Sequence, residues 1–281
     1  MSGRLGARLI HASAILDKGY RLFNRVRSAT VLRWAGESTL RAYGELAYGR
    51  TEDYLPQSSL FNKSLYRWED EAVGRFFPAP PARVLIGGAG GGREALVLAE
   101  RGYQVVGFEP ARPLADALHR ASQRAGGVEV WLGRYETLPE VEALDAGKGK
   151  ADLGALGRFD AAIFGWASFS HIRRELDRLN ALRAVGSVTS GPILASFYLA
   201  SSAPAGKMGP RRLARLLGEH EQEQFALNTG YYHTFRPDEV RSLAERAGLG
   251  VAYFCPGDRD GAWPHVVLVP AGAPVAGRTS R

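Results

Sequence analysis

A glycine-rich segment carries the strongest chemical signal in the chain. It spans Val84 to Glu94 and reads VLIGGAGGGRE. Glycines lack a Cβ atom, so they accept positive φ angles and let backbone N–H groups approach a ligand closely. The apolar run 84–86 predicts a buried strand, and the residues from Arg93 onward predict a helix. The start of that helix favours a negative group, such as a carboxylate or a phosphate.

Glu109 closes the next apolar run, 105–108, and follows the last glycine of the segment by 17 residues. A carboxylate at this place can accept hydrogen bonds from both hydroxyls of a ribose. The alternative is a solvated glutamate at the end of a strand. The glycines of 90–95 also satisfy the loose G-x-G-x-x-G/A pattern of dinucleotide-binding proteins.

Two histidines are candidates for proton transfer. His171 follows the apolar run 161–164 and lies at the predicted carboxyl end of the sheet, where open α/β folds bind ligands. An imidazole there can accept a proton from a hydroxyl or an amine. The competing interpretation places His171 in the first turn of a helix capped by Ser170. His233 is the second candidate base.

Aromatic residues at two places are candidates for covering the site. Tyr231 and Tyr232 precede His233 in a predicted loop, and with Ser170 they are candidate substrate contacts. Four further aromatic residues, before the glycine segment, predict either a lid or packing of an N-terminal cap: Tyr43, Tyr48, Tyr54 and Phe61.

The elements that position these residues alternate between strands and helices. Strands are expected at 84–86, 105–108, 128–132, 161–164, 193–198, 251–254 and 266–269, and helices at 65–76, 93–101, 114–124, 175–185 and 237–247. Apolar strands alternating with helices predict a mostly parallel sheet covered on both faces. The last two strands are too close for a crossover helix and should pair antiparallel. The prediction is a seven-stranded mixed α/β sheet with an N-terminal helical cap.

A proline-rich stretch, 78–81, divides the chain. Residues 1–77 are expected to form the helical cap, 82–270 the ligand-binding domain and 271–281 a disordered tail. Within these parts, 43–62 is predicted as a loop and 143–157 as a surface insertion.

Residues 82–270 resemble the class I methyltransferases that use S-adenosylmethionine (SAM). The resemblance implies that Gly87, Gly88, Gly90 and Gly92 line the methionine and ribose parts of SAM, and that Glu109 holds the ribose hydroxyls. It also gives the adenine contact to Glu136 or Tyr135 and places Gly165 and Trp166 beside the reactive methyl group, with packing as the alternative role of Trp166.

The chain departs from the family at two positions. Arg134 stands where an acidic residue is common, and Ile86 where the family often has an acidic residue near the amino group of SAM. The partner of that ammonium group is therefore not identified by the resemblance.

The implied function is methyl transfer from SAM to an oxygen or nitrogen of a small metabolite. Because the sulfonium is already activated, the absence of a catalytic triad or a metal cluster is no objection. The alternatives are a non-catalytic SAM-fold binding protein, an enzyme like the aminopropyltransferases, and an NAD-dependent enzyme. Nucleic acid is a disfavoured substrate, since 164–167 lacks the signature of amino-group base methylation and the basic excess lies outside the core.

Charge is concentrated at the N-terminus. The chain has a net charge of +7, of which residues 1–50 carry +6. Apolar and basic residues recur at helical spacing from Leu5 to about Trp34. Such a helix can lie on a membrane surface or meet an acidic partner, or it can cap the domain with its arginines in water. The single cysteine, Cys255, and the absence of a 20-residue apolar run predict a reduced, cytoplasmic protein.

Overall fold

The structure is a computed structural model that describes residues 2–144, 149–200, 222–257 and 261–271. Its centre is a sheet in the order β11-β12-β7-β6-β1-β2-β3-β4-β5. The strands β7, β6, β1, β2 and β3 pair parallel, whereas β12 pairs antiparallel with both β7 and β11. The bounds are β1 Arg83–Gly87, β2 Gln104–Glu109, β3 Val128–Gly133, β4 Glu140–Ala143, β5 Lys150–Asp152, β6 Ala161–Phe164, β7 Ile193–Ser196, β11 Leu249–Cys255 and β12 His265–Pro270.

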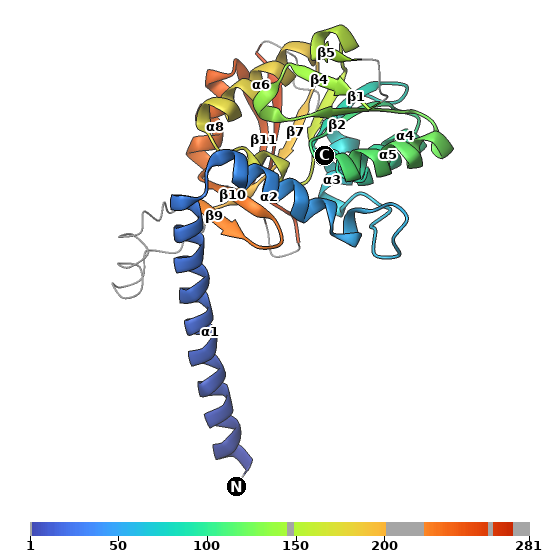
Figure 1. Cartoon of the computed structure of the whole chain (residues 1–281). Helices are drawn as coiled ribbons and strands as arrows, with labels where there is room; N and C mark the ends of the chain where they lie inside the picture. Colours follow the sequence, from blue (N-terminus) through green and yellow to red (C-terminus); the bar gives the residue numbers. More distant parts are fainter. Residues whose placement is uncertain (1, 145–148, 201–221, 258–260, 272–281) are drawn as a thin grey trace, which may run out of the picture.

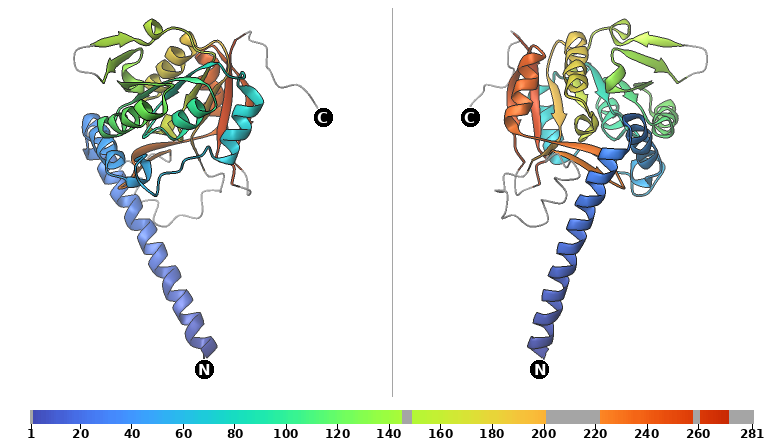
Figure 2. Two further views of the ribbon diagram at one scale, coloured as in Figure 1. Left: turned by 90° about the vertical axis from the view of Figure 1, so that its right-hand side faces the viewer. Right: turned by 60° about the vertical axis from the view of Figure 1, so that its left-hand side comes forward.

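Helices cover both faces of this sheet (Figures 1 and 2). They are α3 Arg67–Phe76, α4 Arg93–Glu100 and α5 Arg112–Ala125 on one face, and α6 Glu175–Val188 and α8 Pro237–Arg246 on the other. The sequence of β1 shows why both faces are covered, since its apolar side chains point to both. Val84 and Ile86 pack into the apolar core beneath α4 and α5, whereas Leu85 packs into the core beneath α6 and α8. The predicted α/β class and the antiparallel C-terminal hairpin are confirmed.

The sheet has nine strands instead of the predicted seven. The two additional strands, β4 and β5, form an antiparallel edge beside β3 and take in part of the predicted surface insertion. They are short and alternate charged with smaller residues, for example Glu140, Glu142 and Lys150. Edge strands of this kind bury few side chains, so the hydrophobic pattern gives little sign of them.

A second, three-stranded sheet lies under the N-terminal helices. It has the order β8-β10-β9, with β8 Tyr198–Leu199, β9 Glu223–Ala226 and β10 Gly230–Phe235. Helices α1 Ser2–Trp34 and α2 Glu37–Gly49 pack against it. The hydroxyl of Ser28 in α1 accepts a hydrogen bond from the backbone N–H of Phe225.

Two loop predictions were wrong, the one over 43–62 only in its first part, since 50–62 contains no helix or strand but the short helix Glu52–Tyr54. Residues 43–49 belong to α2, which buries Leu40 and packs closely on β10. A Cβ added to Gly230 of β10 would lie 3.0 Å from the Cα of Gly44 in α2. Residues 231–233 belong to β10, in which alternate side chains, including Tyr231 and His233, are buried. Helix α2 and strand β10 pack against each other. The hydrophobic pattern of either segment alone does not show this contact.

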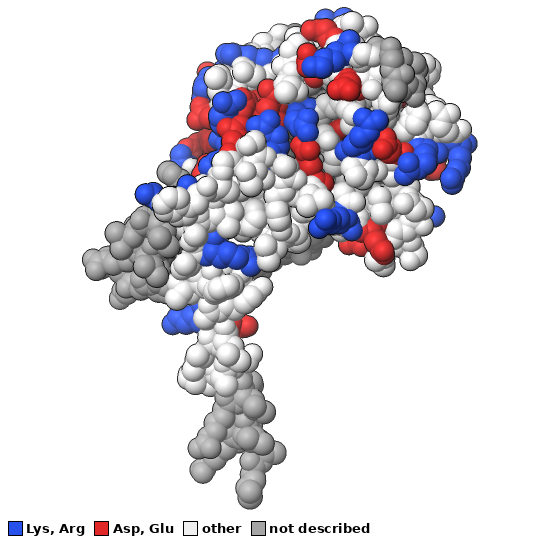
Figure 3. Space-filling view, in the orientation of Figure 1, with Lys and Arg blue, Asp and Glu red and all other residues white. Residues whose placement is uncertain are grey.

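On the face shown in Figure 3, basic and acidic side chains are interspersed over the body of the molecule. No helix in the described part of the chain is long and apolar enough to cross a membrane. The predicted disordered tail lies, apart from its first residue, outside the described residues.

Candidate active site

The glycine segment forms an open backbone turn between β1 and α4. Gly88 and Gly90 adopt positive φ angles of 61° and 56°, which only glycine takes without strain. Both line a cavity of about 460 Å³, together with Gly91. A Cβ atom on Gly91 would lie 1.7 Å from the carbonyl oxygen of Tyr54, so the chain of the cap closes directly over the turn.

Three glycines expected at the cofactor serve close packing instead, and none of them lines the cavity. A Cβ on Gly92 would lie 2.2 Å from Leu118 of α5, and one on Gly87 would lie 2.5 Å from Phe108. A Cβ on Gly165 would lie 2.4 Å from the carbonyl oxygen of Gly88. These residues bring the strands, the helix and the turn together, so they shape the cavity without facing it.

Glu109 ends β2 with its carboxylate at the cavity. Its two oxygens accept hydrogen bonds from the backbone N–H groups of Gly90 (2.8 Å) and Ala111 (2.9 Å). The side chain is buried, and this burial raises its pKa to about 7. The glutamate predicted from its spacing therefore reaches the glycine turn, and it is held there by the backbone.

Glu94 is a second buried carboxylate at the same cavity, and the sequence analysis did not select it. Its Oε1 accepts hydrogen bonds from Arg93 (2.7 Å) and from the backbone N–H of Trp166 (3.1 Å). The available signal was its place in the first turn of α4, where an acidic residue is favoured. Glu94 is therefore a candidate partner for the ammonium group of SAM, which Ile86 cannot bind.

The cap supplies the roof of the cavity. Of the four aromatic residues expected as a lid, Tyr48, Tyr54 and Phe61 line the cavity, whereas Tyr43 packs on Phe225. Tyr54 belongs to the short helix η1 Glu52–Tyr54. Other residues that line the cavity are Leu40, Tyr66, Arg134, Tyr135, Glu136, Trp166, Ser168, His171, Ile172, Arg173 and Tyr231.

Two ion pairs fasten the cap to the sheet domain. Arg134, after β3, donates two hydrogen bonds to Glu45 of α2, at 2.7 and 2.8 Å. Arg93 at the start of α4 donates to both oxygens of Glu69 in α3 and lies 4.3 Å above the Tyr66 ring. The first of these gives Arg134, which departs from the family pattern, a partner in the cap.

Tyr135 and Glu136 both line the cavity, in the short helix η2 Tyr135–Thr137. The hydroxyl of Tyr135 lies 2.8 Å from the hydroxyl of Ser168, and its ring stacks on Phe164. Burial raises the pKa of both Tyr135 and Glu136. Both residues thus line the same cavity as the glycine turn, and the Tyr135 hydroxyl would lie 3.3 Å from a Cβ added to Gly88.

His171 ends the short helix η4 Ser168–His171 and faces the cavity beneath Tyr48. Its Nδ1 lies 2.6 Å from the backbone carbonyl oxygen of Tyr231, and its Nε2 lies 2.8 Å from the Tyr48 hydroxyl. Because a carbonyl only accepts, the proton of the neutral ring sits on Nδ1, and Nε2 accepts from Tyr48. Burial lowers the pKa of His171, which keeps the ring neutral.

Three candidate residues do not reach the cavity: Ser170, Tyr232 and His233. Ser170 is buried in η4, where its hydroxyl accepts a hydrogen bond from the backbone N–H of Tyr198, and it caps no helix. The first turn of α6 starts at Glu175, beyond both Ser170 and His171. Tyr232 points to the other face of β10 and packs on Tyr198.

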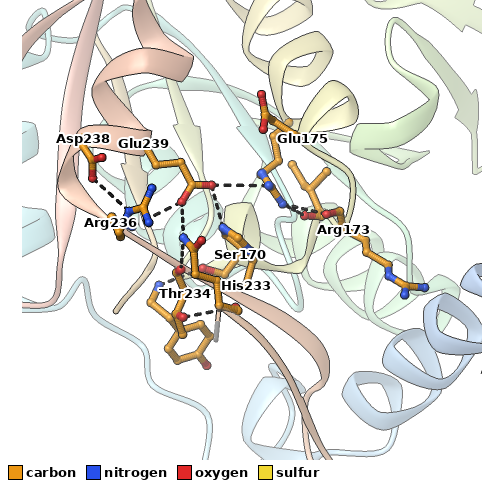
Figure 4. A network of polar contacts seen from close by, with 12 residues as sticks. Ser170, Arg173, Glu175, His233, Thr234, Arg236, Asp238 and Glu239 are labelled. Carbon is orange, nitrogen blue, oxygen red and sulfur yellow. Dashed lines mark hydrogen bonds and ion pairs between the residues drawn. The ribbon is translucent and has the colours of Figure 1, made fainter. Parts of the chain in front are cut away.

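His233 belongs to a separate polar network behind the cavity (Figure 4). Its Nε2 lies 2.7 Å from Oε1 of Glu239, which also pairs with Arg178. Arg178 in turn donates to the carbonyl oxygens of Ile172 and Arg173, the two residues after His171. The network therefore holds the chain beside the candidate base, and His233 itself does not face the cavity.

Two solved structures share this architecture, and both are SAM-dependent methyltransferases. The one from Methanosarcina mazei is 16% identical, with a TM-score of 0.52 over 74% of this chain and 99% of that chain. The one from Clostridium acetobutylicum is 10% identical, with a TM-score of 0.52 over 78% of this chain and 96% of that chain. This chain has the class I methyltransferase fold. No family model and no curated protein matches it.

Within a methyltransferase fold, the cavity described above lies at the carboxyl ends of the parallel strands β1, β2 and β6, which carry the glycine turn, Glu109 and Trp166. This edge is where open α/β sheets bind ligands. The described residues contain no cluster of three or more His, Cys, Asp or Glu side chains able to hold a metal ion.

Proposed function

We propose that this protein is a SAM-dependent methyltransferase that acts on an oxygen or nitrogen atom of a small molecule. One observation carries the proposal: the cavity joins the bare glycine turn and the buried carboxylate of Glu109 beneath a roof of aromatic side chains. The volume of about 460 Å³ is in the range of pockets for small organic ligands.

The chemistry of the lining residues fits SAM. Gly88, Gly90 and Gly91 form a cradle in which backbone takes the place of side chains, and Glu109 would hold the ribose hydroxyls. Glu94 would take the ammonium group, since its carboxylate is buried at the cavity beside the start of α4. Tyr135 and Glu136 would border the adenine. Bound SAM supplies a methyl group activated by a positive sulfur.

The residues of the chain then have to orient the acceptor and remove its proton. Tyr48 and His171 are suited to this, because the Tyr48 hydroxyl donates to the free lone pair of His171 Nε2. In our proposal, Tyr48 takes the proton of the acceptor as it passes its own proton to Nε2. Tyr231 fixes the ring by accepting the hydrogen bond of Nδ1.

The acceptor would lie between α2 and the segment after η4. Leu40 and Ile172 give this part of the cavity apolar surface, and Arg173 and Tyr231 give it polar groups. A roof of aromatic side chains excludes water, which would otherwise compete with the acceptor. The cavity volume of about 460 Å³ favours a small metabolite as the acceptor over a macromolecule.

Calorimetric titration with S-adenosylhomocysteine and, separately, with NAD tests the proposal. We expect micromolar or tighter binding of S-adenosylhomocysteine and no binding of NAD. Binding of NAD alone would contradict the proposal. Binding of S-adenosylhomocysteine without methyl transfer to any of a broad panel of hydroxyl and amine metabolites would favour a non-catalytic binding protein.

A further inference from the structure

The N-terminal helix α1 extends away from the body of the protein (Figures 1 and 2). Its C-terminal part is packed, where Ser28 and Ala29 are buried against the second sheet. Every residue from 11 to 21 is exposed, so no described part of the chain buries this stretch of the helix. An isolated helical segment of this length is marginally stable in water, and a bound partner would stabilise it.

Large apolar side chains gather on this projecting part. Of the nine exposed large hydrophobic residues in the described part of the chain, five belong to α1. Leu16, Tyr20 and Phe23 are 73%, 66% and 62% exposed. They recur at spacings of four and three residues, so they form one stripe along the helix. Single exposed apolar residues are ordinary, whereas a continuous stripe marks an interaction surface.

Basic side chains occupy the opposite side of the same turns. Lys18, Arg21 and Arg25 recur at spacings of three and four residues, and Lys18 is turned about 200° from Leu16. The whole helix has seven Lys or Arg residues and a single acidic residue, Asp17. Figure 3 shows the described part of the helix with mainly uncharged and basic side chains.

The charge of α1 and the area of the stripe distinguish two possible partners, a second copy of the helix and a lipid surface. Two copies of a helix with seven basic residues and one acidic residue repel each other. The described stripe offers roughly 400 Å², whereas a stable protein–protein interface needs about 800 Å² from each partner. A lipid surface needs less apolar area when negative headgroups attract the basic residues, since the two contributions add.

We propose that the projecting part of α1 binds the surface of an anionic lipid bilayer. Leu16, Tyr20 and Phe23 enter the boundary between headgroups and acyl chains, and Lys18, Arg21 and Arg25 remain in the negative potential of the surface. The helix lies on the membrane and does not cross it. This inference concerns α1 alone and does not depend on the proposed methyl transfer.

Co-flotation of the full chain with lipid vesicles tests the proposal. One set of vesicles contains phosphatidylcholine only, and the other contains phosphatidylcholine with 30% phosphatidylglycerol. We expect binding to the anionic vesicles to be at least about tenfold stronger, and to weaken as salt is raised. The double variant Leu16→Asp/Phe23→Asp and the double variant Arg21→Glu/Arg25→Glu should each weaken this binding by about tenfold or more.

Matched controls separate these effects from a general change of charge. Leu176→Asp replaces an exposed leucine of α6, and Arg120→Glu/Arg124→Glu reverses two exposed arginines four residues apart on α5. Both should bind vesicles as the unchanged chain does. Equal binding to the two vesicle types, or no binding to either, would overturn the proposal. So would light scattering that shows a dimer in the unchanged chain and a monomer in Leu16→Asp/Phe23→Asp.

Discussion

The two walls of the candidate site are built in different ways. The wall formed by β1, β2 and the glycine turn presents backbone, with Glu109 bound by two N–H groups and Gly92 pressed against Leu118 of the core. The wall formed by the cap presents side chains, with Tyr48 on His171 and Glu45 on Arg134. The first wall is fixed by packing of the sheet domain. The second depends on a few polar contacts between segments far apart in the sequence.

This contrast assigns the two walls different tasks. A rigid backbone cradle suits a ligand that is the same in every reaction, whereas a side-chain wall can be adapted to one acceptor. Substitutions should therefore affect either cofactor affinity or turnover, according to the wall they change.

The largest effect is expected on the cap side of the site. His171→Ala should lower turnover by roughly 10²–10⁴, because it removes the proton acceptor, and Tyr48→Phe should lower it comparably because it breaks the relay. Affinity for S-adenosylhomocysteine should change less than about twofold in both. The measurement is release of S-adenosylhomocysteine with an acceptor found in the metabolite panel.

His119→Ala, on the outer surface of α5, is the control for that comparison and should leave turnover unchanged. Full activity of Tyr48→Phe together with loss in His171→Ala would show that the acceptor reaches Nε2 directly. Full activity of both variants would remove the pair from the reaction.

On the backbone side, Glu109→Ala should weaken binding of S-adenosylhomocysteine by about 1.5–3 kcal/mol, the scale of hydrogen bonds to a charged group. Calorimetry measures this directly, and circular dichroism checks the fold. Glu100→Ala, at the exposed end of α4, serves as the control. Equal affinities in Glu109→Ala and the unchanged chain would place the ribose elsewhere.

Substitutions at the neighbouring residues Gly91 and Gly92 should have different effects, because Gly91 contacts the cap and Gly92 contacts the core. Gly91→Ala, whose Cβ meets the Tyr54 carbonyl, should push the cap away and weaken S-adenosylhomocysteine binding by about tenfold with little loss of stability. Gly92→Ala adds a Cβ at a φ of 97° against Leu118 and should cost about 2–3 kcal/mol of unfolding free energy.

Chemical denaturation and calorimetry on both variants check this. The control is Gly74→Ala in α3, where an added Cβ meets nothing within 4 Å. Loss of stability in Gly91→Ala together with loss of affinity alone in Gly92→Ala would contradict the assignment of Gly91 to closure of the cap and of Gly92 to packing of the core.

The smallest effect is expected from pH. Burial raises the pKa of Glu109 to about 7, above its unfolded value near 4.3. Since the protonated form is favoured in the folded chain, its contribution to stability is complete below pH 4 and is lost as pH rises through about 7. Ribose hydroxyls prefer the carboxylate, so S-adenosylhomocysteine should bind about fivefold more tightly at pH 8 than at pH 6. In Glu109→Gln this dependence should disappear, and its persistence would point to another group.

The sequence allowed prediction of the backbone wall because its signals are local. The glycines of 87–92 stand between a strand and a helix, and Glu109 ends the neighbouring strand, so the order of elements alone brings them together. Local spacing could not separate Gly88 and Gly90, which line the cavity, from Gly87 and Gly92, which pack against Phe108 and Leu118.

The cap wall could be predicted only in part, for a physical reason. Tyr48 and His171 are 123 residues apart, and their contact depends on α2 packing against β10. Both segments were predicted as loops, because Tyr- and Gly-rich sequences lack a clear period until a partner buries one face. For the same reason Glu94 was overlooked, since its role depends on Trp166 reaching it from β6.

A crystal structure with S-adenosylhomocysteine bound tests the proposed site most directly. We expect its ribose hydroxyls on Glu109, its amino group within hydrogen-bonding distance of Glu94 and its sulfur facing the Tyr48–His171 pair. Density for the ligand outside this cavity, or a ligand whose ribose faces away from Glu109, would contradict the proposed site.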